Sequence, residues 1–183
     1  MGVEHAGLAA LAALRQLLGD RTQMLVINQR GDLSLREFAF GKGIEESEID
    51  RLEERLHVHL PSAYRAILGA YNGLTLFDDP DGHQWGFHLF SVAEAVDAQE
   101  QHKRFHTRDP WPDSYVVVAH SFGDLDAIVL DTARVTHDGL DCLVLDAAAG
   151  ERISAWEVAD NGISTWLDRL IVSQGSKYWL WRV

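Results

Sequence analysis

The chain has 183 residues, of which 46% are hydrophobic and 24% are charged, as is typical of a soluble globular protein. Its 16 Lys and Arg residues against 28 Asp and Glu residues give a formal charge of −12, which argues against direct binding to nucleic acid, because phosphate contacts need clustered cations. The charge favours a cationic partner instead, although many acidic proteins carry such a charge for solubility alone.

Signals for a membrane or an export route are weak in this sequence. No run approaches the roughly 18 consecutive apolar residues that a membrane span needs. The Ala- and Leu-rich opening follows Glu4 and His5 rather than cations, unlike a secretory signal. The single cysteine, Cys142, excludes an internal disulfide and suits a reducing compartment. We therefore expect a cytoplasmic protein without membrane contact.

Residues 1–43 predict a helix followed by two strands. Leucines three or four residues apart over residues 5–18 have helical periodicity. Residues 24–27 and 33–40 have strand character, and the residues between them are typical of a turn. The two strands are placed to pair as a hairpin. We interpret residues 1–43 as an N-terminal extension of the domain that follows.

Two short helices are predicted next. Ser47, followed by acids, suits a helix start. Pro61 suits the start of the second helix. The backbone N–H groups in the first turn of a helix have no partner within the helix, and proline has no N–H to leave unpaired. Asn72 and Gly73 supply a left-handed exit. The apolar stripes of the two helices are Ile49, Leu52 and Leu56, and then Tyr64, Ile67, Leu68 and Tyr71.

From residue 74 the pattern indicates strands, interrupted by one helix over 91–105 and closed by another that begins near Ile163. The aromatic tail, residues 177–183, is expected to dock on the body. The fold class is therefore α+β, with a helical entry, a mostly antiparallel curved sheet of about five to six strands and a closing C-terminal helix. The expected strands are residues 74–77, 85–90, 115–119, 125–130, 142–145 and 153–156.

Several of these segments, in this order, resemble the SMI1/KNR4 (SUKH) family. The resemblance covers about residues 44–172, so residues 44–183 are interpreted as an SMI1/KNR4-like domain with an aromatic tail. Most of these residues also have a folding role, so they indicate the scaffold rather than an active site. They are Ile49, Leu52, Glu53, Leu56, Leu60, Pro61, Tyr64, Leu68, Asn72, Gly73, Leu89, Ser91, Glu94, Gly123, Asp124 and the segments 115–119, 128–131 and 161–170.

The resemblance implies a non-catalytic protein-binding domain. Many bacterial members look like immunity proteins, so the expected function is an intracellular immunity protein that occludes the active site of a polymorphic toxin, with a nuclease as one candidate target. The expected partner is a cationic toxin domain. The alternative is a regulatory scaffold that binds a housekeeping partner, as in cell-wall-related SMI1/KNR4 proteins.

The residues themselves predict no catalysis, cofactor or metal. The chain has no nucleophile elbow, phosphate-binding glycine loop or zinc-protease motif. His102 and His106 are spaced as zinc ligands on a helix, but Lys103 and Arg104 between them are cationic, and a solvated helix end is the preferred interpretation. Residues 78–82 lack the ligand spacing of a calcium loop. Cys142 follows an acid and has no adjacent base, as in a buried structural cysteine.

Acidic residues on expected loops, with tryptophans near some of them, are the candidate partner-binding residues. Tryptophan often dominates the binding energy of a protein interface, and aspartate pairs with arginine or lysine of the partner. The alternative is that these loops are simply solvated. The candidates are Asp78, Asp79, Asp81, Trp85, Asp109, Trp111, Asp113, Asp124 and Asp126.

Overall fold

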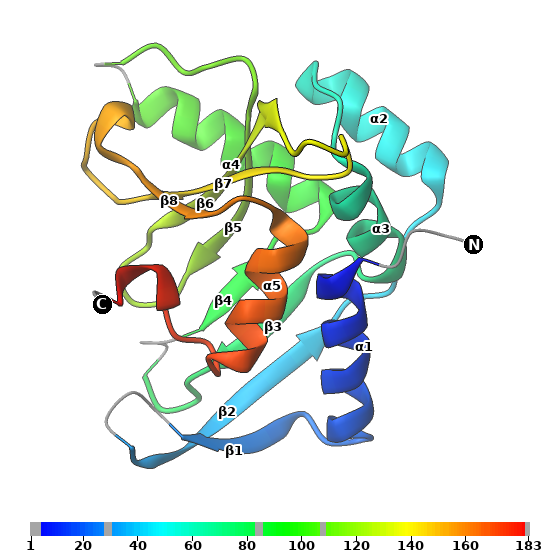
Figure 1. The fold of residues 1–183 in the computed structure, drawn as a ribbon, viewed down its shortest axis with the longest axis vertical. Coiled ribbons are helices and arrows are strands. Elements are labelled where there is room, and N and C mark those ends of the chain that lie inside the picture. Colours follow the sequence, from blue (N-terminus) through cyan, green and yellow to red (C-terminus); the bar gives the residue numbers. More distant parts are fainter. Residues whose placement is uncertain (1–4, 28–30, 83–85, 107–108, 182–183) are drawn as a thin grey trace.

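The structure is a computed structural model that describes residues 5–27, 31–82, 86–106 and 109–181 (Figure 1). The described residues form five α-helices, eight strands and two 3-10 turns. In chain order these are α1 (Ala6–Leu18), β1 (Gln23–Ile27), β2 (Leu33–Phe40), α2 (Glu46–Leu56), α3 (Ser62–Ala70), β3 (Leu74–Asp78), β4 (Phe87–Leu89), α4 (Val92–Phe105), β5 (Tyr115–Ser121), β6 (Ala127–Val135), β7 (Cys142–Ala147), η1 (Ile153–Ala155), β8 (Glu157–Asp160), α5 (Ile163–Val172) and η2 (Tyr178–Leu180).

The eight strands form one antiparallel meander, in which each strand pairs with its neighbours in sequence. The α+β class is confirmed, but the expected count of five to six strands is too low, because the hairpin β1–β2 joins the sheet through β3. The expected curvature is also wrong: the sheet is open and uncurled, since β1 and β8 remain its two edges. The strand expected at 153–156 is a 3-10 turn, and the strand follows it at Glu157–Asp160.

Both faces of the sheet are covered, and the side chains of its central strands alternate between two apolar cores. In β6, Ile128 and Leu130 belong to the larger core, whereas Ala127 and Val129 belong to the smaller one, as the two-residue period of a strand requires. Helices α1, α2, α3 and α5 contribute to the larger core, and α4 contributes Val96 to the larger core and Ala95 to the smaller one. Because both faces of these strands are buried, their sequences are continuous runs of apolar residues.

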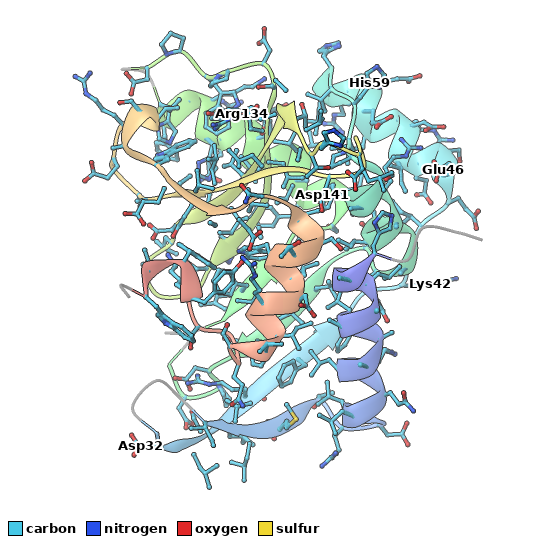
Figure 2. The ribbon with its side chains drawn as sticks, viewed as in Figure 1. Asp32, Lys42, Glu46, His59, Arg134 and Asp141 are labelled. Carbon is cyan, nitrogen blue, oxygen red and sulfur yellow. The ribbon has the colours of Figure 1, made fainter. Side chains whose placement is uncertain are left out.

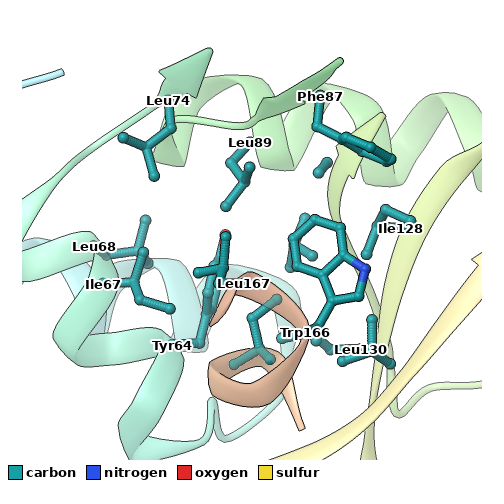
Figure 3. Packing of buried hydrophobic residues seen from close by; sticks show 14 of the residues in the cluster. Tyr64, Ile67, Leu68, Leu74, Phe87, Leu89, Ile128, Leu130, Trp166 and Leu167 are labelled. Carbon is teal, nitrogen blue, oxygen red and sulfur yellow. The ribbon is translucent and has the colours of Figure 1, made fainter. Parts of the chain in front are cut away.

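Helix α5 fills the centre of the larger core. Trp166 and Leu167 are fully buried, and Figure 3 shows both side chains between helix α3 and the strands that carry Phe87 and Ile128. The ring of Trp166 meets that of Phe87 edge-on, with centroids 5.5 Å apart. Removing a buried tryptophan side chain costs about 3–5 kcal/mol, so this predicted closing helix anchors the fold.

Capping side chains explain where α4 and α2 begin. The hydroxyl of Ser91 accepts the N–H of Glu94 at 3.4 Å, and the Glu94 carboxylate accepts the N–H of Ser91 at 2.8 Å. The predicted start of α4 is therefore confirmed. The N-cap of α2 is Glu45 rather than the predicted Ser47, because the Glu48 carboxylate accepts the N–H of Glu45 at 3.4 Å.

The N-terminal segment is tied to the rest of the fold at two places. Its hairpin is confirmed by the antiparallel register of β1 with β2, and β2 pairs with β3. Helix α1 lies beside α5 (Figure 1), and the N–H of Gly7 donates to Ser164 Oγ at 2.9 Å. A Cβ at Gly7 would lie 2.6 Å from the carbonyl oxygen of Ser164. Only glycine permits this close approach.

Candidate partner-binding site

The first group of predicted partner-binding residues lies at the end of β3 and in the turn after it. Asp78 is buried, and Asp79 pairs with Arg36 at 3.3 Å. Asp81 is exposed. Trp85 lies outside the described residues. Asp81 is therefore the carboxylate of this group that is open to a partner.

The second group, Asp124 and Asp126, binds the chain's own C-terminal tail. The Lys177 ammonium lies 2.9 Å from Asp124 Oδ2, 2.6 Å from Asp126 Oδ2 and 3.3 Å from Asp146 Oδ2. Trp179 donates its indole N–H to Asp146 at 2.8 Å. The tail therefore docks on the body, as its aromatic composition predicts. Because Lys177 lies beside Asp124 and Asp126, an internal cation already neutralises part of the charge of these two aspartates.

Asp109, Trp111 and Asp113 are the candidates that the fold gathers in one place, on the segment between α4 and β5. Asp109 accepts the N–H of Ile153 at 3.2 Å, which ties the segment to the connection between β7 and β8. The half-buried Trp111 donates its indole N–H to the carbonyl oxygen of Tyr115 at 3.3 Å. Asp113 is exposed. The segment borders two depressions, one at Asp109 and the other at Asp113.

Trp111 belongs to an aromatic cluster and does not project alone. Its ring centroid lies 5.8 Å from that of Trp156 and 5.6 Å from that of His106. His106 meets Trp156 edge-on at 5.1 Å, and Tyr115 stacks on Trp156 at 6.0 Å. Each such aromatic pair contributes about 0.5–1.5 kcal/mol beyond the area that it buries. The cluster therefore holds the segment firmly against the sheet.

A cavity of about 790 Å³ opens beside the aromatic cluster, and we call it the histidine pocket. Charged residues also line it: Asp109 lies 3.9 Å from Arg152, and Glu151 is adjacent in sequence. Figure 1 shows the C-terminal end of α4 beside η1. The pocket lies next to this end of the helix. The walls are formed by His102 of α4, His106 just beyond its C-terminal end, His120 of β5, and the apolar residues Phe90, Phe105 and Leu125.

Two imidazoles of the histidine pocket are held in the neutral form. Burial, and then the charges of His106 and His120, lower the pKa of His102 from 6.5 to about 4. Burial and the charge of His88 lower the pKa of His120, against the smaller opposite effect of Glu94. Near neutral pH these rings therefore each present one N–H donor and one acceptor nitrogen without a positive charge.

A second depression, of about 730 Å³, lies between the C-terminal half of α2, residues 113–114 and β6, and we call it the acidic groove. No lysine or arginine is among the described residues that line it. Figure 2 shows His59 beyond the C-terminal end of α2 and Glu46 at its opposite end. The ionisable lining residues are Asp50, Glu53, Glu54, His57, His59 and Asp113.

The charge of the acidic groove is only partly neutralised from within. Arg65 of α3 lies 2.7 Å from Asp50 and 2.7 Å from Glu53. Glu54 and Asp113 are exposed, and neither has an ion-pair partner in the part of the chain that the structure describes. Two carboxylates on elements far apart in the sequence are therefore available at one surface.

Sequence reasoning predicted Asp113 but missed the carboxylates of α2, because it considered acids on loops. The signal that would have found them is the acidic run over residues 45–54. Ile49 and Leu52 of this run are buried against the core. Since these apolar positions face inward, the acids between them must face solvent.

The described residues contain no group of three or more His, Cys, Asp or Glu side chains placed to hold a metal ion. His102 and His106 do lie on one side of α4, with ring centroids 6.0 Å apart. Burial, followed by the charge of Asp141, raises the pKa of the Cys142 thiol to about 12, so the thiol stays protonated. Within the described ranges, no helix combines the length and apolar character that crossing a membrane requires.

Comparison with known protein families matches residues 43–169 to the SMI1 / KNR4 family (SUKH-1). Among individual proteins, the chain is similar to the uncharacterized protein YnaB of Bacillus subtilis (strain 168). The two are 25% identical over 142 residues, which cover 78% of this chain and 86% of that protein. The matched segment contains the acidic groove and the walls of the histidine pocket.

Proposed function

The chain belongs to the SMI1/KNR4 family (SUKH-1), and from this premise we propose that it is a non-catalytic, cytoplasmic immunity protein that binds a cationic toxin domain. The observation that carries the proposal is the acidic groove, where Glu54 and Asp113 present free carboxylates on a chain of net charge −12. Inhibition is steric and electrostatic: the bound protein occludes the active site of the toxin and turns nothing over.

Electrostatic complementarity explains why an acidic groove suits this role. Opposite charges steer two proteins together and raise the association rate, and the effect weakens with salt. A nuclease toxin has a cationic groove for its nucleic acid substrate, and an acidic protein of this kind would occupy that groove in its place. An interface of roughly 800 Å² on each partner is sufficient for specific binding.

The predicted partner-binding residues have different parts in this proposal. Asp113 contacts the partner directly, because it is exposed at the acidic groove, and the exposed Asp81 remains a second candidate. Asp109 and Trp111 hold the segment that carries Asp113. Asp78, Asp79, Asp124 and Asp126, which are buried or paired within the chain, contribute to the overall negative field.

The test combines growth rescue with binding kinetics. The chain is expressed together with a panel of polymorphic toxin domains, and rescue of growth identifies the target. For that toxin, we expect the double charge reversal Glu54→Lys with Asp113→Lys to slow association about tenfold and to reduce its salt dependence. The matched control is Asp20→Lys with Glu157→Lys, which makes the same change of net charge at two exposed positions outside the groove.

Equal slowing by both pairs would show that net charge alone, and not the acidic groove, steers the partner. Unchanged association with the groove pair would exclude the groove from the interface. If no toxin is rescued, and a housekeeping protein co-purifies with the chain in equal amounts, the regulatory scaffold is the correct function instead.

A further inference from the structure

The histidine pocket has no part in the electrostatic contact proposed above, yet it has the features of a binding site. Its volume of about 790 Å³ falls within the range of roughly 300–1,000 Å³ that is usual for ligand pockets, which are mostly apolar with a few convergent polar groups. Here the apolar walls come from Phe90, Phe105 and Leu125. The polar groups include three imidazoles, together with Gln101, Asp109, Glu151 and Arg152.

Two of the apolar wall residues lie at the opening of the pocket. Phe105 is 73% exposed and Leu125 is 70% exposed, although both line the cavity. They come from the end of α4 and from the turn between β5 and β6. Large apolar side chains that are left in water around a concavity mark interaction surfaces. The opening therefore offers apolar contacts to whatever enters the pocket.

We infer that the histidine pocket receives an uncharged aromatic side chain, tryptophan or tyrosine, of the protein partner; this inference rests on the proposed function and names the anchor of that interface. An indole or phenol ring packs against Phe90 and Phe105, and its single N–H or O–H group meets an imidazole nitrogen. Tryptophan and tyrosine are the residues that most often anchor protein interfaces in such pockets.

The charges around the pocket favour an uncharged occupant over an ionic one. Asp109 and Arg152 pair with each other across 3.9 Å, and Glu151 adds one exposed carboxylate. Apart from the exposed carboxylate of Glu151, neither a cation nor an anion therefore meets an excess of opposite charge in the pocket. The rings of His102 and His120 are neutral near pH 7 because burial lowers the pKa of each. A charged group that entered beyond this exposed carboxylate would lose hydration without gaining a buried ion pair.

The same groups make the docking sensitive to pH. His102 of α4 and His120 of β5 become cations when protonated and then repel each other. His106, just beyond α4, also faces the pocket and further disfavours the cation of His102. Asp109, Glu151 and Arg152 face them from the neighbouring connections, and His88 and Glu94 lie behind His120. A bound aromatic ring removes further water from the imidazoles. Binding therefore opposes protonation, and affinity falls below pH 6.5, first through the lowered pKa of His120 and then through that of His102 at about 4.

The test uses the full chain and defined probes, so it does not depend on knowing the toxin. N-acetyl-L-tryptophanamide and N-acetyl-L-tyrosinamide are titrated near neutral pH while NMR follows the imidazole ring protons. We expect saturable shifts at His102, His106 and His120 with a dissociation constant on the order of 1 mM. N-acetyl-L-argininamide should shift these signals much less. Repeating the titration near pH 4, the folded pKa of His102, should weaken the aromatic probes at least about twofold.

Variants at the opening test the location. Phe105→Ser and Leu125→Ser should each weaken the aromatic probes about threefold or more, because they remove apolar contacts. Leu33→Ser is the matched control, since Leu33 is 69% exposed on β2 and does not line the pocket. The inference is overturned if no saturable shift occurs, if the arginine probe binds as well, or if the control weakens binding equally. Failed probe binding with intact toxin rescue would refute the pocket and leave the proposed function standing.

Discussion

Among the residues of the histidine pocket, His102 has the environment that differs most from that of a free side chain. Its folded pKa of about 4 lies below its ordinary value of 6.5, because burial and two neighbouring imidazoles disfavour the cation. Between these two values the unfolded chain binds a proton that the folded chain does not. Unfolding is therefore favoured progressively as the pH falls through this window.

We expect the free energy of unfolding to fall between pH 6.5 and about 4, and His102→Gln to reduce this fall. The slope from one such group is at most about 1.4 kcal/mol per pH unit, and partial solvent exposure lowers it. Denaturant unfolding followed by tryptophan fluorescence at several pH values measures it. His137→Gln is the control, because His137 is exposed and lies outside the pocket. Identical slopes in all three proteins would contradict this account.

The candidate residues of the pocket were only partly predictable at this scale. The spacing of His102 and His106 placed both on one side of a helix, and their stacked rings agree. His120 lies on β5, and its approach to α4 depends on how the helix packs on the sheet. No local pattern carries that information, so the third imidazole could not be predicted.

At the scale of elements, the C-terminal tail is held by a cation that contacts the turn between β5 and β6 and the strand β7. Lys177 contacts Asp124, Asp126 and Asp146. Burial lowers the pKa of Lys177, but the three carboxylates outweigh this effect and raise it. Burial likewise raises the pKa of Asp146, and the Lys177 charge opposes the rise. The two buried groups therefore depend on each other.

We expect Lys177→Met to destabilise the fold by about 3 kcal/mol, because it leaves the buried Asp146 without its cation. Adding Asp146→Asn should restore part of the loss, since the uncompensated charge is removed. Denaturant unfolding of the two single variants and the double variant gives the coupling free energy. Lys42→Met, at an exposed lysine, should be nearly neutral. Strictly additive losses would show that Lys177 and Asp146 are not coupled.

At the scale of the whole molecule, the N-terminal segment completes both the sheet and a helix layer. We propose that residues 1–43 are an extension of the family domain at residues 44–183. Strand β2 covers the edge of β3, and α1 buries Leu11, Leu14 and Leu18 against the larger core. Without these residues, β3 would become an exposed edge, which is prone to pair with other chains.

A chain that begins at residue 44 should therefore be less stable by several kcal/mol, since each of the three buried leucines contributes about 1.5–3 kcal/mol, and it should aggregate more readily. Gly7→Val should cause a smaller loss, because it obstructs only the contact between α1 and α5. Thermal unfolding and light scattering measure both effects. An unchanged melting temperature for the shortened chain would show that the segment is only a loose cover.

By itself, the sequence determined the α+β class, the family, the closing helix and most strands, because hydrophobic periodicity and capping act between residues close in the chain. Only the tertiary structure decided which carboxylates are free for a partner. Asp124 and Asp126 look as available as Asp113 in the sequence, yet Lys177, 51 residues beyond Asp126, binds both. Asp113 instead lines the acidic groove, as does Glu54 of α2. Ion pairs and grooves depend on how distant strands and helices pack, and that packing is not written in any local pattern.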